Sequence, residues 1–118
     1  MIEVGEYVRT KKGIVGKFKK YLKSIYFQGQ DIELENYIIF LEDEDEVVKH
    51  SKNITDLIEV GDYVNGKKVI EADNCKGAIR ELYLEGQNPD KDCGIYFEQI
   101  ETVVTKEQFK SIEYRLEN

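Results

Sequence analysis

Five consecutive carboxylates, Glu42, Asp43, Glu44, Asp45 and Glu46, form the densest group of chemically active side chains in this chain. Such a run can bind a divalent cation, present negative charge to a basic protein, or form a solvated turn. The whole chain holds 17 basic and 24 acidic residues, a formal net charge of −7. A negative surface repels phosphate backbones, so this balance argues against general nucleic-acid binding and favours a protein partner with a basic surface.

The residues available for catalysis are few. His50 is the single histidine, and it lies in a lysine-flanked polar stretch. One imidazole excludes a metal centre built on several histidines, and Cys75 and Cys93 do not complete a closed zinc site with it. The segment 13–17 resembles a phosphate loop only loosely, because Phe18 stands where Ser or Thr is required. We therefore expect no enzyme activity, no metal and no cofactor.

A second candidate site combines cations with aromatic rings. Basic side chains near the start of the chain could hold a phosphate, and a tyrosine could stack on a base. The same lysines also fit an ordinary hairpin whose exposed strand carries charge. The candidate ligand-binding residues are Arg9, Lys11, Lys12, Tyr83, Tyr96 and Tyr114.

A seven-residue phrase occurs twice, from Ile2 to Val8 and from Ile58 to Val64, at a shift of 56 residues. Carried on without a gap, the match covers nine of the thirteen positions from Ile2 to Ile14. Self-similarity at a fixed spacing predicts one structural unit built twice. A unit of this size has only a marginal core of its own, so we expect the halves to pack as one pseudo-symmetric body.

The pattern of the chain favours strands over helices, because aromatic and β-branched residues stand in short apolar runs broken by turn residues. Asn65-Gly66 predicts a two-residue hairpin turn, since both residues readily take positive φ. The spacing of Thr105 and Gln108 is that of a capping box and predicts a short helical or 3-10 turn near 106–112. The predicted strands are 7–10, 14–18, 24–28, 37–41, 63–64, 69–72, 78–85 and 95–104, and 88–92 is predicted as a loop.

The predicted elements and their order resemble those of a known class of small β-barrels. A Val-Gly-acid-aromatic-Val strand, a Lys/Gly turn, a strand such as 14–17 and a one-turn helix before the last strand together resemble small SH3-like or KOW-like β-barrels. Taken twice, they cover nearly the whole chain. The stretch from Val48 to Ile54 and the one from Asp56 to Gly66 also resemble short uncharacterised proteins of phages and prophages. The resemblance implies an all-β fold of two duplicated SH3-like barrels, residues 1–58 and 59–118.

We expect a non-enzymatic phage or prophage protein that inhibits a host defence protein through the acidic run. One alternative is a nucleotide-binding sponge that sequesters a small phosphorylated signal, and another is a KOW-like adaptor for RNA or a transcription complex. No apolar stretch approaches the roughly 20 residues that a membrane span requires, and the start of the chain lacks the features of a signal peptide. We therefore expect a cytoplasmic protein in the host cell. Homo-oligomerisation and pairing of Cys75 with Cys93 stay open.

Overall fold

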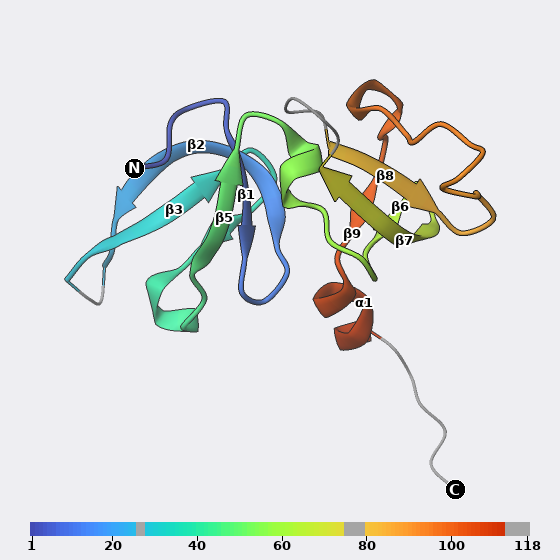
Figure 1. The fold of residues 1–118 in the computed structure, drawn as a ribbon. Coiled ribbons are helices and arrows are strands. Elements are labelled where there is room, and N and C mark those ends of the chain that lie inside the picture. The colour runs from blue at the N-terminus through green and yellow to red at the C-terminus, as the bar shows by residue number, and fades with distance from the viewer. Residues whose placement is uncertain (26–27, 75–79, 113–118) are drawn as a thin grey trace, which may run out of the picture. The chain divides into compact units, whose positions relative to one another are not determined.

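The computed structural model describes residues 1–25, 28–74 and 80–112, and the chain divides into two units, residues 1–57 and 58–118. Each unit is built on an antiparallel sheet (Figure 1). Helical structure in the described ranges is limited to one short α-helix and three 3-10 helices. The prediction of a mostly β chain is therefore confirmed.

Unit 1 contains a five-stranded sheet in the spatial order β4-β3-β2-β1-β5. Its strands are β1 (Tyr7–Thr10), β2 (Val15–Lys23), β3 (Gln30–Leu34), β4 (Ile38–Ile39) and β5 (Val47–Ser51). The 3-10 helix η1 (Leu41–Asp43) precedes β5, and η2 (Ile54–Leu57) follows it. The buried core of this unit consists of Val8, Phe18, Leu34 and Ile39.

Unit 2 contains a four-stranded sheet in the order β8-β7-β6-β9. Its strands are β6 (Tyr63–Val64), β7 (Lys67–Asn74), β8 (Arg80–Leu84) and β9 (Val103–Val104). The 3-10 helix η3 (Phe97–Gln99) precedes β9, and the helix α1 (Lys106–Ile112) follows it. The buried core of this unit consists of Ile58, Val64, Val69, Leu82 and Leu84.

The two sheets pair their central strands in the same scheme. In unit 1, β2 and β3 shift register between Phe18 and Lys20. In unit 2, β7 and β8 shift register between Val69 and Glu71. Both irregularities directly follow a buried core residue of the longer strand. A bulge increases local twist and bends the strand that carries it, so both sheets bend at the same point.

The repeated phrase forms the same turn in each unit. Gly5 and Gly61 have φ of 95° and 99°, a left-handed conformation that favours glycine. Their amides donate to the carbonyls of Phe18 and Val69, at 3.5 and 2.9 Å. Tyr7 and Tyr63 are then the first residues of β1 and β6. The match between the two sequence phrases is thus a match in backbone structure.

Beyond Val8 and Val64, residues that match in the ungapped sequence alignment no longer occupy equivalent positions in the structure. In unit 1, Val8 pairs with Gly16 across a hairpin that turns at Lys11–Gly13. In unit 2, Val64 pairs with Lys67, and only Asn65 and Gly66 connect the strands. Asn65 and Gly66 have φ of 51° and 80°, which confirms the predicted hairpin turn. The second hairpin is therefore shorter, and the lysines that match in the two sequences occupy different positions.

Several predicted boundaries are wrong. The predicted strand 95–104 contains η3, and only its last two residues form β9. The predicted strand 24–28 includes residues outside the described ranges, and Ser24 and Ile25 lie beyond the end of β2. The predicted strand 37–41 is reduced to two residues of strand, because η1 begins at Leu41. Neither sheet closes into a barrel among the described strands, since each has two edge strands that pair on one side only.

The predicted cap of the last helix is confirmed. The Thr105 hydroxyl accepts a hydrogen bond from the Gln108 amide at 3.2 Å, and α1 begins at Lys106. The Phe109 ring stacks on Tyr63 with its centroid 4.5 Å away, a contact that ties the helix to β6. Asp62, which is fully buried, accepts hydrogen bonds from the amides of Glu59 and Lys106, at 2.7 and 2.9 Å.

We predict that Asp62→Ala destabilises unit 2 by about 3 kcal/mol, because hydrogen bonds to a charged group contribute roughly 1.5 to 3 kcal/mol each and two buried amides lose their acceptor. Urea unfolding followed by circular dichroism measures this loss. Asp90→Ala is the control, since it removes the same charge from an exposed turn of the same unit. Equal effects of the two substitutions would contradict the role assigned to Asp62.

Candidate functional site

The acidic run of unit 1 forms a defined loop between β4 and β5. The first of its carboxylates belong to η1, and Glu44 ends that helix in a left-handed conformation with φ of 56°. The side chains of Glu42, Asp43, Glu44 and Glu46 are exposed, whereas Asp45 is half-buried. We call residues 41–46 the acidic loop.

The hairpin turn of β1 and β2 holds the acidic loop in place. The Lys12 amide donates to Asp45 Oδ1 at 3.0 Å, and Lys12 Nζ donates to the Asp43 carbonyl at 2.5 Å. The Lys11 amide donates to the Glu46 carbonyl at 2.9 Å. Asp45 Oδ1 also accepts from the Glu46 amide, at 3.0 Å. One carboxylate of the five thus serves the loop itself, and the other four carry charge outward.

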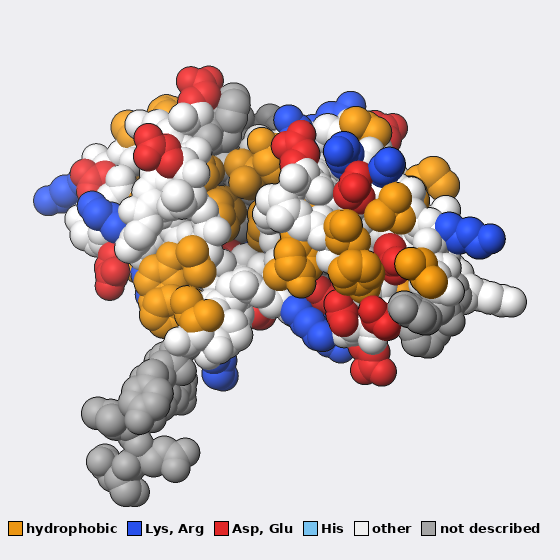
Figure 2. Space-filling model, turned by 180° about the vertical axis from the view of Figure 1, so that it is seen from behind, with side chains coloured by type: hydrophobic (Ala, Val, Ile, Leu, Met, Phe, Trp, Pro, Cys, Tyr) orange, Lys and Arg blue, Asp and Glu red, His pale blue; other side chains and the backbone are white. Residues whose placement is uncertain are grey.

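A second contact fixes the start of the loop. The Leu41 amide donates to Asp31 Oδ1 at 2.8 Å, and Asp31 is 7% exposed. Phe40 and Leu41 are 41% and 38% exposed, so apolar surface adjoins the carboxylates. Figure 2 shows acidic side chains gathered beside basic ones at the lower edge of the face that it displays. The sequence identified the charges of this loop, but not the apolar residues next to them.

The basic residues of the alternative ligand-binding set belong to unit 1 and differ in their surroundings. Arg9 is 1% exposed, and its Nη1 donates to the Leu57 carbonyl at 3.0 Å. Lys11 and Lys12 are exposed, but their turn contacts the acidic loop, whose negative charge opposes phosphate binding. Arg9 is therefore a buried residue that stabilises unit 1, and the two lysines lie next to the carboxylates of the acidic loop.

The tyrosines of that set belong to unit 2 and differ in exposure. Tyr83 is 6% exposed, and its hydroxyl donates to Glu81 Oε2 at 2.5 Å. Tyr96 is 55% exposed and lines a cavity of unit 2. Tyr114 lies outside the described residues. Of the three, Tyr96 is the one that the structure describes with an accessible ring.

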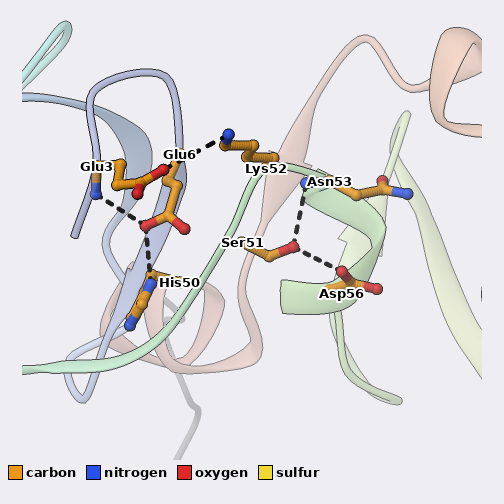
Figure 3. Close-up of polar contacts among 7 residues, drawn as sticks. All are labelled: Glu3, Glu6, His50, Ser51, Lys52, Asn53 and Asp56. Atoms are coloured by element: carbon orange, nitrogen blue, oxygen red, sulfur yellow. Dashed lines mark hydrogen bonds and ion pairs between the residues drawn. The ribbon is translucent and has the colours of Figure 1, made fainter. Parts of the chain in front are cut away.

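His50 takes part in a polar cluster at one end of β5 (Figure 3). Its Nδ1 lies 2.8 Å from Glu6 Oε2, and the same carboxylate oxygen accepts from the Glu3 amide at 3.1 Å. The hydrogen bond from Glu3 and the contact with His50 hold the pKa of Glu6 below its ordinary value of 4.5. Lys52 forms an ion pair with Glu3 at 3.5 Å. The cluster fastens the repeated turn to β5.

The hydroxyl nearest to His50 in sequence is also engaged in local structure. Ser51 Oγ donates to Asp56 Oδ2 at 2.6 Å and accepts from the Asn53 amide at 3.1 Å, so it caps the approach to η2 (Figure 3). Within ranges 1–25, 28–74 and 80–112, no group of three or more His, Cys, Asp or Glu side chains is placed to hold a metal ion. Cys93 is an exposed free thiol.

In the described part of the chain no helix has the length and apolar character needed to span a bilayer. The chain matches no family model, no curated protein and no solved structure at a significant level.

Asp45 offers a test of how the acidic loop is held. We predict that Asp45→Ala lowers the free energy of unfolding by about 1 to 2 kcal/mol, because the amides of Lys12 and Glu46 lose their acceptor. Urea unfolding measures the change. Glu46→Ala removes the same charge from the neighbouring exposed position and should stay within about 0.5 kcal/mol of the wild type. If Glu46→Ala costs as much as Asp45→Ala, the loop is not anchored by Asp45.

Glu6 should make stability depend on pH in the acid range. A carboxyl with a lowered pKa in the folded state contributes stability that is present above about pH 4.5 and is lost as the pH falls through the folded pKa. We predict that Glu6→Gln flattens this part of the profile, so the variant loses less stability than the wild type between about pH 5 and about pH 3. Urea unfolding across this range measures it, and parallel profiles would contradict the assignment.

Proposed function

We propose that this protein is a non-enzymatic binding protein that presents its acidic loop to a basic surface of a protein partner. The observation that carries the proposal is the anchoring of the loop. Four exposed carboxylates stand on a backbone fixed by Lys11, Lys12 and Asp31. A solvated turn needs no such anchoring, whereas a preorganised charged surface lowers the entropy lost on binding.

The charge balance favours a basic partner. The acidic loop holds five carboxylates, and the turn that contacts it contributes two lysines, so the local surface stays negative. Clustered charge of one sign raises the rate of encounter with a surface of opposite sign and selects against partners of the same sign. A surface that binds nucleic acid is basic, and the acidic loop would therefore compete with nucleic acid for it.

The exposed side chains of Phe40 and Leu41 add to this proposal. Exposed charge acts mainly on the rate of encounter, and buried apolar contacts contribute more of the affinity. Two partly exposed apolar side chains at the start of the acidic loop supply such contacts next to the charge. We propose that the partner presents apolar residues adjoining its basic ones.

The proposal also covers the origin of the two units and the biological setting of the protein. We propose that the two units are duplicated SH3-like repeats, supported by the shared turn at Gly5 and Gly61 and by the shared bulge position. The resemblance to short phage and prophage proteins suggests the setting, an inhibitor of a host defence protein. Competition with nucleic acid for a basic channel is the mechanism that fits both the charge and this setting.

The test compares two variants of equal net charge. The loop variant carries Glu42→Gln, Asp43→Asn, Glu44→Gln and Glu46→Gln and keeps Asp45, which anchors the backbone. The control variant carries Glu35→Gln, Glu85→Gln, Glu98→Gln and Glu101→Gln, at exposed positions outside the loop. Partners are captured from a bacterial lysate, and association rates with the captured protein are measured at two salt concentrations.

We predict that the loop variant associates with the partner at least about tenfold more slowly than the wild type at low salt, with a flatter salt dependence. The control variant should bind as the wild type does, and nucleic acid added in excess should displace the partner. Equal loss in both variants would mean that net charge alone is responsible. Unchanged binding by the loop variant would remove the acidic loop from the interface.

A further inference from the structure

We propose that unit 2 contains a binding site for a small uncharged heterocycle, of which a nucleobase or nucleoside is the type. The site is a cavity of about 360 Å³, within the range of pockets that hold small ligands. It is lined by Asn65, Gln87, Cys93, Gly94, Ile95, Tyr96 and Gln99. This proposal is independent of the acidic loop, which belongs to unit 1.

The cavity arises from an addition that unit 2 has and unit 1 lacks. In unit 1 the core residues Leu34 and Ile39 are separated by a short turn and the start of β4. In unit 2 the corresponding residues are Leu84 and Ile95. Ile95 corresponds to Ile39 because it pairs with Leu82 of β8, as Ile39 pairs with Ile32 of β3. The longer connection is the orange loop after β8 in Figure 1. Extra residues in one copy of a repeat often build the binding face.

The long connection is closely held by its own hydrogen bonds. The Asn88 amide donates to Asp92 Oδ2 at 2.6 Å, and the Asp92 amide donates back to the Asn88 carbonyl at 2.7 Å. Gly94 lies close to β8, because a Cβ there would come within 2.9 Å of Glu81 Cβ and 3.2 Å of the Leu82 carbonyl. The wall of the cavity is thus formed before any ligand binds.

Backbone amides fix the orientation of both glutamine side chains in the cavity wall. Gln87 Oε1 accepts from the Leu84 amide at 2.7 Å, and Gln99 Oε1 accepts from the Tyr96 amide at 2.9 Å. An amide donor identifies the accepting atom as oxygen, so each Nε2 must be on the other side of its carboxamide. Each carboxamide therefore keeps a nitrogen that donates hydrogen bonds, held in place by its own oxygen.

Asn65 completes the wall and is itself saturated as an acceptor. Its Oδ1 accepts from the amides of Glu101 and Thr102 at 2.7 and 3.1 Å, and its Nδ2 donates to the Gln99 carbonyl at 2.8 Å. The short hairpin of unit 2 is what brings Asn65 to this position. The groups that remain for a ligand are then the glutamine nitrogens, the Tyr96 ring and hydroxyl, and the Cys93 thiol.

The chemistry of these groups defines the ligand class. The described lining contains no lysine, arginine, aspartate or glutamate, so it offers no counter-charge to a phosphate or an ammonium group. Two amide donors call for a ligand with carbonyl or ring-nitrogen acceptors, and the half-exposed Tyr96 ring provides a face for stacking. A nucleobase has both properties. A strand of nucleic acid has the same base but adds charge that the net −7 of the chain repels.

The thiol of Cys93 supplies the readout, because it is exposed and lines the cavity. Alkylation of the full-length protein by iodoacetamide is followed at the Cys93 peptide by mass spectrometry. The probes are uridine, cytidine, adenosine and inosine, the 5′-monophosphate of each, and a hexanucleotide of thymidine. We expect at least one nucleoside to slow alkylation about threefold at twice its Kd, as mass action requires, and the charged probes to protect less.

Two substitutions separate a donor role from a structural one. Gln87→Glu and Gln99→Glu keep the oxygen that accepts from the backbone but replace the donating nitrogen, so we expect the fold to persist and protection to be lost. Gln30→Glu adds the same charge at an exposed position of unit 1 and should leave protection intact. Tyr96→Ala, at a half-exposed position, should weaken nucleoside binding about tenfold if the ring stacks on the base.

Nucleoside protection that survives Gln30→Glu and is lost in both cavity glutamate variants supports the site. The absence of protection by all four nucleosides up to their solubility limits overturns it, as does protection that is unchanged in both glutamate variants. Protection by the hexanucleotide at lower concentration than by any nucleoside overturns the assignment of a small ligand and makes the cavity part of a strand-binding surface.

Discussion

The carboxylate that follows the glycine of the repeated phrase is the interaction on which each unit depends. In unit 2, Asp62 binds the amide three residues before it and the first amide of α1. In unit 1, Glu6 binds the amide of Glu3 and the imidazole of His50. One side chain thus closes the turn and joins it to the end of the last strand or to the helix that follows. Loss of that carboxylate would release the turn that starts the sheet.

The two carboxylates differ in a way that their lengths explain. Asp62 is the shorter side chain, and it is fully buried with two backbone amides as its partners, one of them the first amide of α1. Glu6 is longer and reaches a side chain of β5, and its carboxylate stays partly accessible to water, with 14% of its side chain exposed. Glu6 gives unit 1 a dependence of stability on pH, because the Glu3 amide and His50 lower the pKa of its carboxyl. The exchange of Glu for Asp within the repeated phrase therefore directs the carboxylate to a side chain of β5 in unit 1 and to the first amide of α1 in unit 2.

Much of the fold was predictable because its determinants are local. The turn at Gly5 and Gly61, the hairpin at Asn65-Gly66 and the cap at Thr105 each rest on a few adjacent residues whose conformational preferences are strong. The strand ends were less predictable. Residues 95–104 are apolar enough for a strand, but the amides of Glu101 and Thr102 bind Asn65, which lies more than 30 positions away.

The sites, too, were predictable only where they depend on residues that are adjacent in the sequence. The acidic run is visible in the sequence because its members are consecutive, but its anchoring by Lys12 is a contact between residues more than 30 positions apart. The same separation hides the commitment of Arg9 to Leu57, which removes that cation from the predicted phosphate site. The cavity of unit 2 draws on three separate segments, and its polar residues are amides that no charge or metal pattern marks. Of its lining residues, the sequence singled out Asn65, as part of a hairpin turn, and Tyr96, as a ring that could stack on a ligand.

The two units pair their central strands in the same scheme but have different surfaces. The bulges and turn glycines of the two units coincide, and the main differences lie in the connections, whose backbone is not part of the sheet. Unit 1 has the longer hairpin between its first two strands, and that hairpin carries the lysines that hold the acidic loop. Unit 2 has the shorter hairpin and the longer connection after β8, and this connection lines a neutral cavity. The charged surface of unit 1 and the uncharged pocket of unit 2 thus accompany opposite differences in loop length on similarly paired strands.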